Sequence, residues 1–352
     1  MWVKRLIAGA IALGLLTTAI VFSYEAPVVR VGKGSGEDAQ VVSLEDMSNV
    51  LHSVRSLGTS DYAASLSSEA QTPSRYSSVT VTEATNMLSE NSNSGNASSS
   101  SSQTSFRRKL KIALTENAAY YHSEGQMASH STSERNGDGT RTKRENKTYM
   151  DFSIEIYMSA ETVLLKVDRF EYYSYSSYTY TNEIDSSQNE EEETWEEDDT
   201  LDRLAEHLGE WIDCTSSPEI AIGFLQINES NVETLGSIGD FVDQTIGNES
   251  QFFTHEDGHY TASEEGLLRL FGLSAADQDS LKNFDGTFDI DLSSAEQPSI
   301  LLDMSNSVSN DTGKLKAGLR EEFLFANINN TIVELAPNVK TIDIGEIVGE
   351  EM

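Results

Sequence analysis

The stretch that decides the fold lies near the middle of the chain, where residues 148–167 read TYMDFSIEIYMSAETVLLKV. Apolar residues recur at every second position on both sides of a short break at residues 159–162. A period of two places successive side chains on opposite faces of a strand, so each half of the stretch predicts a strand with one apolar face. The break between them predicts a tight reversal.

Strand patterning continues on both sides of this hairpin. Residues 106–131 form a long and mostly polar strand candidate, and the Asn-Gly-Asp-Gly sequence at 136–139 supplies turn residues that join it to the stretch above. Beyond Val167 the alternation changes parity at Phe170, as a β-bulge would cause. These segments predict an antiparallel meander of long strands.

Helical periodicity appears on either side of the meander. Ser43 and Asp46 form a capping box for an amphipathic helix that Gly58 ends. Further helices are expected between residues 200 and 284, with a short strand at 219–227. Strand alternation then returns at Phe288–Leu292, Ile300–Met304, Leu315–Ile328 and Thr331–Leu335. The sequence therefore predicts an α+β fold, in which a large curved antiparallel β-sheet has helices packed on one face.

The N-terminus has the layout of an export segment. Lys4 and Arg5 precede an uncharged apolar run from Leu6 to Phe22, which predicts either a cleaved signal peptide or a retained N-terminal membrane anchor. Either alternative places the rest of the chain outside the cytoplasm, as a secreted or membrane-anchored protein.

Composition divides the chain into segments. We expect a signal or anchor at 1–23; a linker, the amphipathic helix and a Ser-rich mobile segment at 24–105; the sheet domain at 106–337 with a helical insertion at 200–284; and an acidic C-terminal tail at 338–352. Within the second segment, residues 91–105 are almost devoid of apolar side chains and are expected to form a mobile loop.

Charge and cysteine content narrow the possible functions. A net charge of −34 at pH 7 would repel the phosphates of nucleic acid, so no nucleic-acid partner is expected. Cys214 is the single cysteine, which makes an intramolecular disulfide impossible. No basic residue lies close to it in the sequence to lower the thiol pKa, and we interpret it as a partly buried thiol.

One motif resembles a metal site. Residues 255–259, His-Glu-Asp-Gly-His, match the HExxH pattern of zinc hydrolases, in which a helix places both histidines on one face. Asp-Gly is unfavourable inside a helix and favourable in a two-residue hairpin turn. We therefore expect a hairpin and assign no catalytic residue, metal or cofactor, with His255 and His259 as zinc ligands the weaker alternative.

A second motif concerns carbohydrate. Tyrosines crowd one strand candidate, at positions 172, 173, 175, 178 and 180. Exposed aromatic rings of this kind could stack on sugar faces, which predicts a cell-surface adhesion or carbohydrate-binding module. The alternative interpretation is that tyrosine simply favours strands.

The C-terminal third carries a family resemblance. Gly286–Leu292 (GTFDIDL), Pro298–Met304 (PSILLDM) and Glu321–Pro337 resemble the ending of uncharacterised secreted proteins and lipoproteins of Gram-positive bacteria, which are similar in layout to the lipoprotein-carrier fold. The resemblance covers about residues 251–337. It implies a non-enzymatic extracytoplasmic protein that binds an apolar or lipid-like ligand on a concave sheet.

The expected ligand surface consists of apolar strand residues. If a pocket exists, we expect it to be lined by Phe152, Ile154, Ile156, Val163, Leu165, Val167, Phe323 and Phe325. The alternative for each of them is an ordinary packed core. The expected partners are thus a lipid or other apolar ligand, and the membrane if the N-terminal helix is retained.

Overall fold

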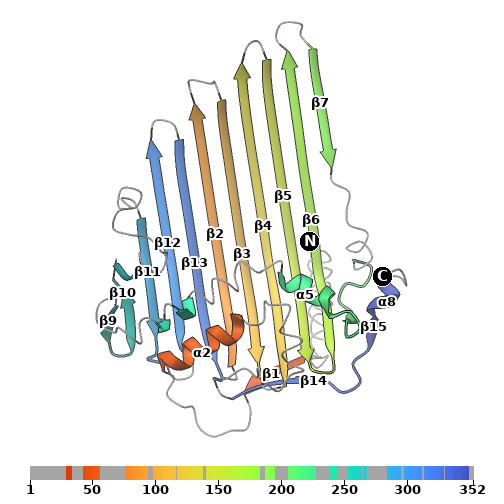
Figure 1. The fold of residues 1–352 in the computed structure, drawn as a ribbon, viewed down its shortest axis with the longest axis vertical. Helices are drawn as coiled ribbons and strands as arrows, with labels where there is room; N and C mark the ends of the chain where they lie inside the picture. Colours follow the sequence, from red (N-terminus) through yellow and green to blue (C-terminus); the bar gives the residue numbers. More distant parts are fainter. Residues whose placement is uncertain are drawn as a thin grey trace, which may run out of the picture.

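The computed structural model consists mainly of long β-strands (Figure 1). It describes residues 29–33, 43–55, 77–93, 98–115, 117–137, 140–182, 187–194, 205–226, 238–240, 242–243, 253–263, 265–267, 284–294, 297–310, 313–328 and 330–348. The strands are β1 (Val29–Lys33), β2 (Ser77–Asn93), β3 (Ser98–Leu114), β4 (Ala118–Gly137), β5 (Thr140–Ser159), β6 (Val163–Asn182), β7 (Ser187–Thr194), β8 (Trp211–Asp213), β9 (Phe253–Glu256), β10 (His259–Ala262), β11 (Phe284–Asp291), β12 (Ser299–Asn310), β13 (Gly313–Ala326), β14 (Thr331–Leu335) and β15 (Thr341–Asp343). The helices are α2 (Leu44–Arg55), α5 (Pro218–Gln226) and α8 (Ile344–Val348).

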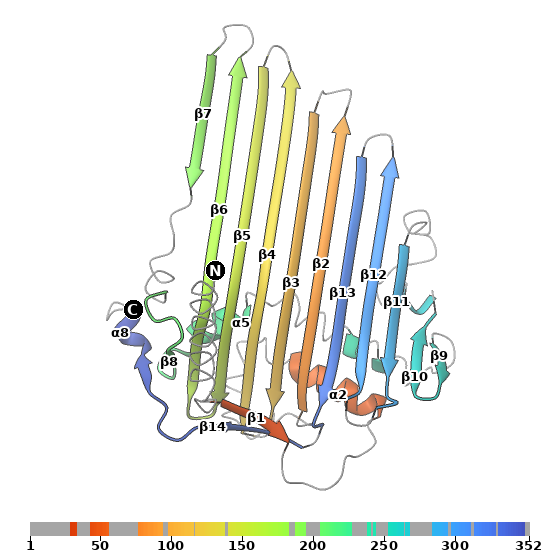
Figure 2. The same cartoon turned by 180° about the vertical axis from the view of Figure 1, so that it is seen from behind.

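One sheet dominates the described part of the chain. It contains thirteen strands in the order β15-β8-β6-β5-β4-β3-β2-β13-β12-β11-β10-β9, with β7 added beside β6. Every pair in it is antiparallel except β15 with β8. A second, two-stranded sheet pairs β1 with β14 and crosses the lower end of the large sheet (Figure 2).

The expected α+β class is wrong, because the described chain is nearly all β with few, short helices. Two local assignments changed: residues 219–226 belong to helix α5, and Trp211 and Ile212, expected in a helix, form β8. The largest difference between the expected and the observed structure lies in the Ser-rich stretch. Residues 98–105 are strand, paired along their whole length with β2 and β4. Backbone hydrogen bonds in a long hairpin do not require apolar side chains, so the composition of these residues gave no indication of a strand.

Several strand predictions are confirmed. β4, β5 and β6 form the expected meander, and the parity change is a bulge at Asp168, since Ser153 pairs with Arg169 and Ile154 with Val167. Residues 106–131 are not one strand, however. β3 ends at Leu114 and the antiparallel β4 begins at Ala118, so the chain reverses between these two residues. The capping box is also confirmed, because the Ser43 hydroxyl accepts a hydrogen bond from the Asp46 backbone N–H at 3.1 Å.

Some expectations fall outside the described residues. These include the export segment at 1–23, residues 56–76 of the segment expected at 24–105, and most of the helical region at 227–283. In the segment expected to be an acidic tail, β15 and α8 are ordered against the sheet, and Ile344 and Ile347 are buried in the main apolar cluster.

The lower half of the sheet holds the core. We call the side on which α2 lies the front face (Figure 1) and the side on which β1 lies the back face (Figure 2). On the front, Met47, Val50 and Leu51 of α2 pack on apolar side chains of the sheet. On the back, Val29 belongs to a smaller cluster with Trp211 and other residues of the large sheet. The sheet is therefore covered on both sides in this half.

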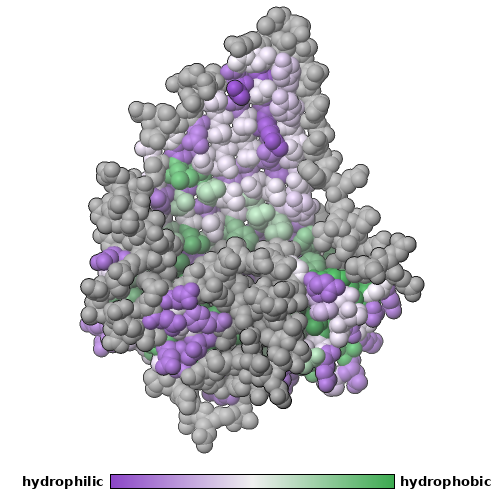
Figure 3. Space-filling view, in the orientation of Figure 1, coloured by the Kyte–Doolittle hydropathy of each residue, from purple (hydrophilic) through white to green (hydrophobic). Residues whose placement is uncertain are grey.

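Within the part of the chain that the structure describes, the upper half is a single layer. Two shallow pockets lie at the same height on β2, β3, β4 and β5. By alternation, most side chains of the first belong to the front face and most of the second to the back face, although five residues border both pockets. On the front, Figure 3 shows a pale, polar upper region above a band of apolar residues. Strands of 17 to 20 residues make this extension possible, since ordinary strands of about 5–6 residues would end within the core.

Candidate functional site

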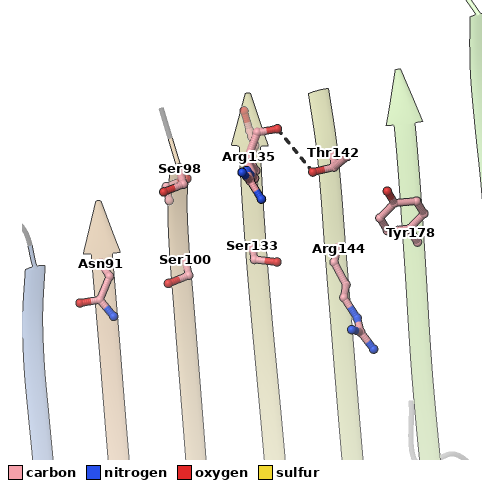
Figure 4. Close-up of a pocket in the computed structure, with 10 residues that line it drawn as sticks. Asn91, Ser98, Ser100, Ser133, Arg135, Thr142, Arg144 and Tyr178 are labelled. Carbon is pink, nitrogen blue, oxygen red and sulfur yellow. Dashed lines mark hydrogen bonds between the residues drawn. The ribbon is translucent and has the colours of Figure 1, made fainter. Parts of the chain in front are cut away.

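The upper front face carries the clearest candidate site. Strand pairing places Ser100, Ser133, Arg144 and Tyr178 in one row across β3, β4, β5 and β6. Asn91 of β2 continues the row beside Ser100. Figure 4 shows these side chains together. Because all belong to the same alternation class of their strands, they share one face.

These residues line an open pocket of about 630 Å³. The next row up contributes Ser98, Arg135 and Thr142, with the Thr142 hydroxyl donating to the Arg135 carbonyl oxygen at 3.4 Å (Figure 4). Ser99 and Glu134 also border the pocket, but alternation places their side chains on the back face. The front-face side chains thus offer hydroxyls, one amide, two guanidinium groups and a phenol ring. Such a set provides both donors and acceptors on a flat surface.

Arg144 is positioned by a hydrogen-bonded chain in the row below. Its Nε donates to Asn146 Oδ1 at 3.3 Å. The same oxygen accepts from the Ser176 hydroxyl at 2.8 Å, and the Asn146 amide donates to Ser131 Oγ at 3.2 Å. Asn146 therefore connects β4, β5 and β6 and holds the guanidinium group close to the sheet.

Charges on the two faces of the same hairpin differ in their pairing. On the back face, Arg141 Nε lies 3.0 Å from Glu134 Oε1, and Lys147 Nζ lies 2.9 Å from Glu145 Oε1. Hydrogen bonds from Arg141 hold the pKa of Glu134 below its ordinary value, and those from Lys147 do the same for the pKa of Glu145. On the front face, neither Arg135 nor Arg144 has an acidic partner among the described residues.

The predicted tyrosine platform is divided between the faces. Tyr172 and Tyr178 belong to the front and are 47% and 42% exposed. Tyr173 belongs to the back, as does Tyr175, whose ring lies under the Lys147 ammonium group at 5.4 Å. Strand alternation causes this division, and the bulge at Asp168 decides which tyrosines belong to the front, so a five-ring stacking surface on one face does not form.

The residues expected to line an apolar pocket lie together in the core. All eight are buried, and all belong to the front cluster with α2: Phe152, Ile154, Ile156, Val163, Leu165, Val167, Phe323 and Phe325. None of the described pockets is lined by them. Binding of an apolar ligand by these residues stays a prediction.

The HExxH segment is a hairpin, as expected. β9 and β10 pair around Asp257 and Gly258, which have φ angles of 50° and 87°. His255 stacks on Tyr260 with ring centroids 4.2 Å apart, while His259 lies on the opposite face, 3.6 Å from Asp291. The two histidines cannot bind one metal ion from opposite faces. No cluster suited to a metal ion occurs among the described residues.

Two other chemically suggestive groups have structural roles. Asp243 accepts a hydrogen bond from Ser48 and lies 2.8 Å from His52 Nε2. The carboxylate thus separates serine from histidine, whereas a catalytic triad needs the histidine between them. Cys214 is buried, and burial followed by the charge of Asp213 raises its pKa to about 12, which removes it as a nucleophile.

Sequence reasoning missed the front-face arginines. The signal was present, because the turn between β4 and β5 pairs Gly137 with Thr140. Counting outward from that turn places Ser133 opposite Arg144 and Arg135 opposite Thr142, on one face. Without the register, nothing in the sequence marks the two arginines as neighbours.

Comparisons with known proteins add little to this geometry. No family model matches the chain, and no curated protein matches it. Among solved structures, the translocator domain of autotransporter NalP from Neisseria meningitidis is similar over 81% of this chain and 99% of that chain, at 6% identity and a TM-score of 0.19. A score this low does not establish a shared fold. Within the described residues, no helix has the length and apolar character needed to span a membrane.

Proposed function

We propose that the protein is a non-enzymatic, extracytoplasmic carbohydrate-binding module that uses the upper front face of its sheet. The observation that carries the proposal is the exposed ring of Tyr178 beside a row of hydroxyl and amide groups in an open pocket. Sugars present apolar ring faces next to hydroxyls, so a flat surface that combines an aromatic ring with donors and acceptors matches them.

The architecture supports the same proposal. Within the described residues, the lower half buries apolar side chains on both faces, whereas the upper half exposes polar ones on both. Such an extension adds little burial and therefore little stability. A long, flat and accessible surface is what it does provide, and a polysaccharide chain can lie along such a surface.

An apolar ligand is less well supported. The eight core residues already pack against one another and against α2. A lipid in that position would have to displace α2. The upper front face needs no such rearrangement.

Affinity electrophoresis of the full chain tests the proposal. Gels containing single soluble polysaccharides, both neutral and uronic acid-rich, would be compared with a gel that contains none. We expect at least one polysaccharide to retard the protein. Replacing Tyr178 by Ala should weaken that binding on the order of tenfold, as expected for an anchoring aromatic residue.

The matched control is Tyr175→Ala, which removes the same side chain from the same strand on the back face. It should leave the retardation unchanged. No retardation by any polysaccharide, or equal losses in the two variants, would contradict the proposal.

A further inference from the structure

The two front-face arginines carry an inference about the ligand. Arg135 and Arg144 belong to neighbouring strands and are diagonal across them, because Arg135 is opposite Thr142 and Arg144 is opposite Ser133. Diagonal neighbours in an antiparallel pair lie about 7–8 Å apart or less, within reach of long side chains. Two like charges therefore share one small area.

Among the described residues, neither arginine forms an ion pair with an acidic side chain, and the same is true of Lys143 on the back face. The back-face cations Arg141 and Lys147 are each paired with a glutamate of the same hairpin. With a net charge of −34, the chain has many more acidic than basic side chains that could serve as partners. On the front face, however, the side chains around Arg135 and Arg144 are neutral: Asn91, Ser98, Ser100, Ser133, Thr142 and Tyr178. Glu134 also borders the pocket, but alternation places its side chain on the back face, where it pairs with Arg141.

A guanidinium group presents a planar fork of donors that matches a carboxylate with two parallel hydrogen bonds. The Nε of Arg144 is occupied by Asn146, which leaves its terminal nitrogens for a ligand. Neutral hydroxyls and the Asn91 amide beside it suit sugar hydroxyl groups. The surroundings thus combine carboxylate recognition with sugar recognition.

We propose that the ligand is a polysaccharide that contains uronic acid, with its carboxylates bound by Arg144 and Arg135. This inference rests on the proposed carbohydrate-binding function and specifies its substrate class. Long-range repulsion by the acidic chain does not prevent it, because charges more than about 8 Å away are largely screened at physiological ionic strength. The carboxylate contacts themselves are made within hydrogen-bond distance.

A matched pair of ligands tests the inference. Polygalacturonate and its fully methyl-esterified form share the same backbone, and only the former carries free carboxylates. Binding of each to the full chain would be measured by isothermal titration calorimetry. We expect polygalacturonate to bind tighter by about tenfold to a hundredfold, the range for a hydrogen bond to a charged group.

Two glutamine variants then assign the effect. Arg144→Gln should abolish most of the preference for the free acid over the ester. Arg141→Gln removes the same charge from the same strand on the back face and should keep the preference. Because both substitutions are at exposed positions, neither is expected to affect folding, and circular dichroism would verify this.

The outcomes separate the two proposals. Equal binding of acid and ester would overturn the carboxylate inference and keep the carbohydrate-binding function. Absence of binding to either form, together with no retardation by any other polysaccharide, would overturn both. Equally tight binding of dextran sulfate would replace carboxylate recognition by general recognition of anions, and would also overturn the inference.

Discussion

The lower and upper halves of the same strands differ in what holds them in place. β3 shows this along its length, since Leu110, Ile112 and Leu114 are buried in the front cluster while Ser98 and Ser100 line an open pocket. Below, side chains define the structure by burial. Above, backbone pairing continues the register that the lower half has established, and the side chains are free to serve another purpose.

This difference teaches how a strand can combine stability and function. Register is strongly specified where one face is buried, because a shift by one residue would expose the apolar set. The lower half therefore fixes the position of every residue above it, including Arg144 and Tyr178. Four predictions follow this division, in order of decreasing effect on stability.

Phe323→Ala should destabilise the protein by about 3–5 kcal/mol, the range for deleting a buried ring. Phe323 is 1% exposed and packs in the front cluster. Leu315 lies on the same strand and the same face but in the upper half, and it is 39% exposed. Leu315→Ala should change the free energy of unfolding by less than about 0.5 kcal/mol. Urea denaturation measures both, and equal effects would remove the distinction between the halves.

Gly125→Ala should destabilise by about 1–3 kcal/mol, as for overpacking. An added Cβ there would lie 2.8 Å from the Arg107 carbonyl oxygen and 2.9 Å from Phe152 Cζ. At Gly318, the nearest atom to such a Cβ is the Met304 carbonyl oxygen at 3.7 Å, so Gly318→Ala is the matched control. Thermal unfolding of the two variants would show whether β4 tolerates a side chain at the boundary between the halves.

Asp151→Asn should reduce stability by about 1.5–3 kcal/mol near neutral pH, the value of hydrogen bonds to a charged group. Burial opposes ionisation of Asp151, but hydrogen bonds from Gln126 and Arg169 outweigh it and hold the pKa of Asp151 below its ordinary value. A lowered carboxyl pKa stabilises the fold above the unfolded value of about 3.9, and this contribution is lost as the pH falls below it.

Denaturation at a series of pH values gives the check on Asp151. The difference between wild type and Asp151→Asn should be full above about pH 5 and should shrink as the pH decreases through about 4. A difference that stays constant down to pH 2 would show that Asp151 contributes through packing rather than charge.

Thiol labelling offers the prediction with the smallest effect on stability. Cys214 is fully buried in the lower half, with its pKa raised to about 12. It should resist maleimide at pH 7.5 until the protein unfolds. Ser133→Cys places a thiol on the exposed upper face and should react at once with little loss of stability. Rapid labelling of Cys214 in native buffer would contradict the packing of β8 against β6.

The sequence predicts the lower half better than the upper. Alternation in residues 149–158 and 163–167 identified β5 and the start of β6, because burial selects apolar side chains there. The parity change near Phe170 correctly indicated the bulge. The Ser-rich part of β3 gave no such signal, since backbone pairing alone leaves no hydrophobic period to detect.

The candidate site depends on relations that a single sequence does not display. Tyr178 attracted notice as one of several tyrosines, but its face is decided by the bulge at Asp168. Arg135 and Arg144 become neighbours only through the β4–β5 register. The reversal between Leu114 and Ala118 was missed because the residues on both sides of it continue the strand pattern. The pairing of β3 with β4 was therefore missed too.

Side-chain oxidation footprinting with polygalacturonate tests the location of the site most directly. Tyr178 and Tyr173 are both exposed, lie on the same strand and belong to opposite faces. If the upper front face binds the polysaccharide, the ligand should slow oxidation of Tyr178 and leave Tyr173 unchanged. Protection of Tyr173 instead, or no change at Tyr178 under saturating ligand, would contradict this account.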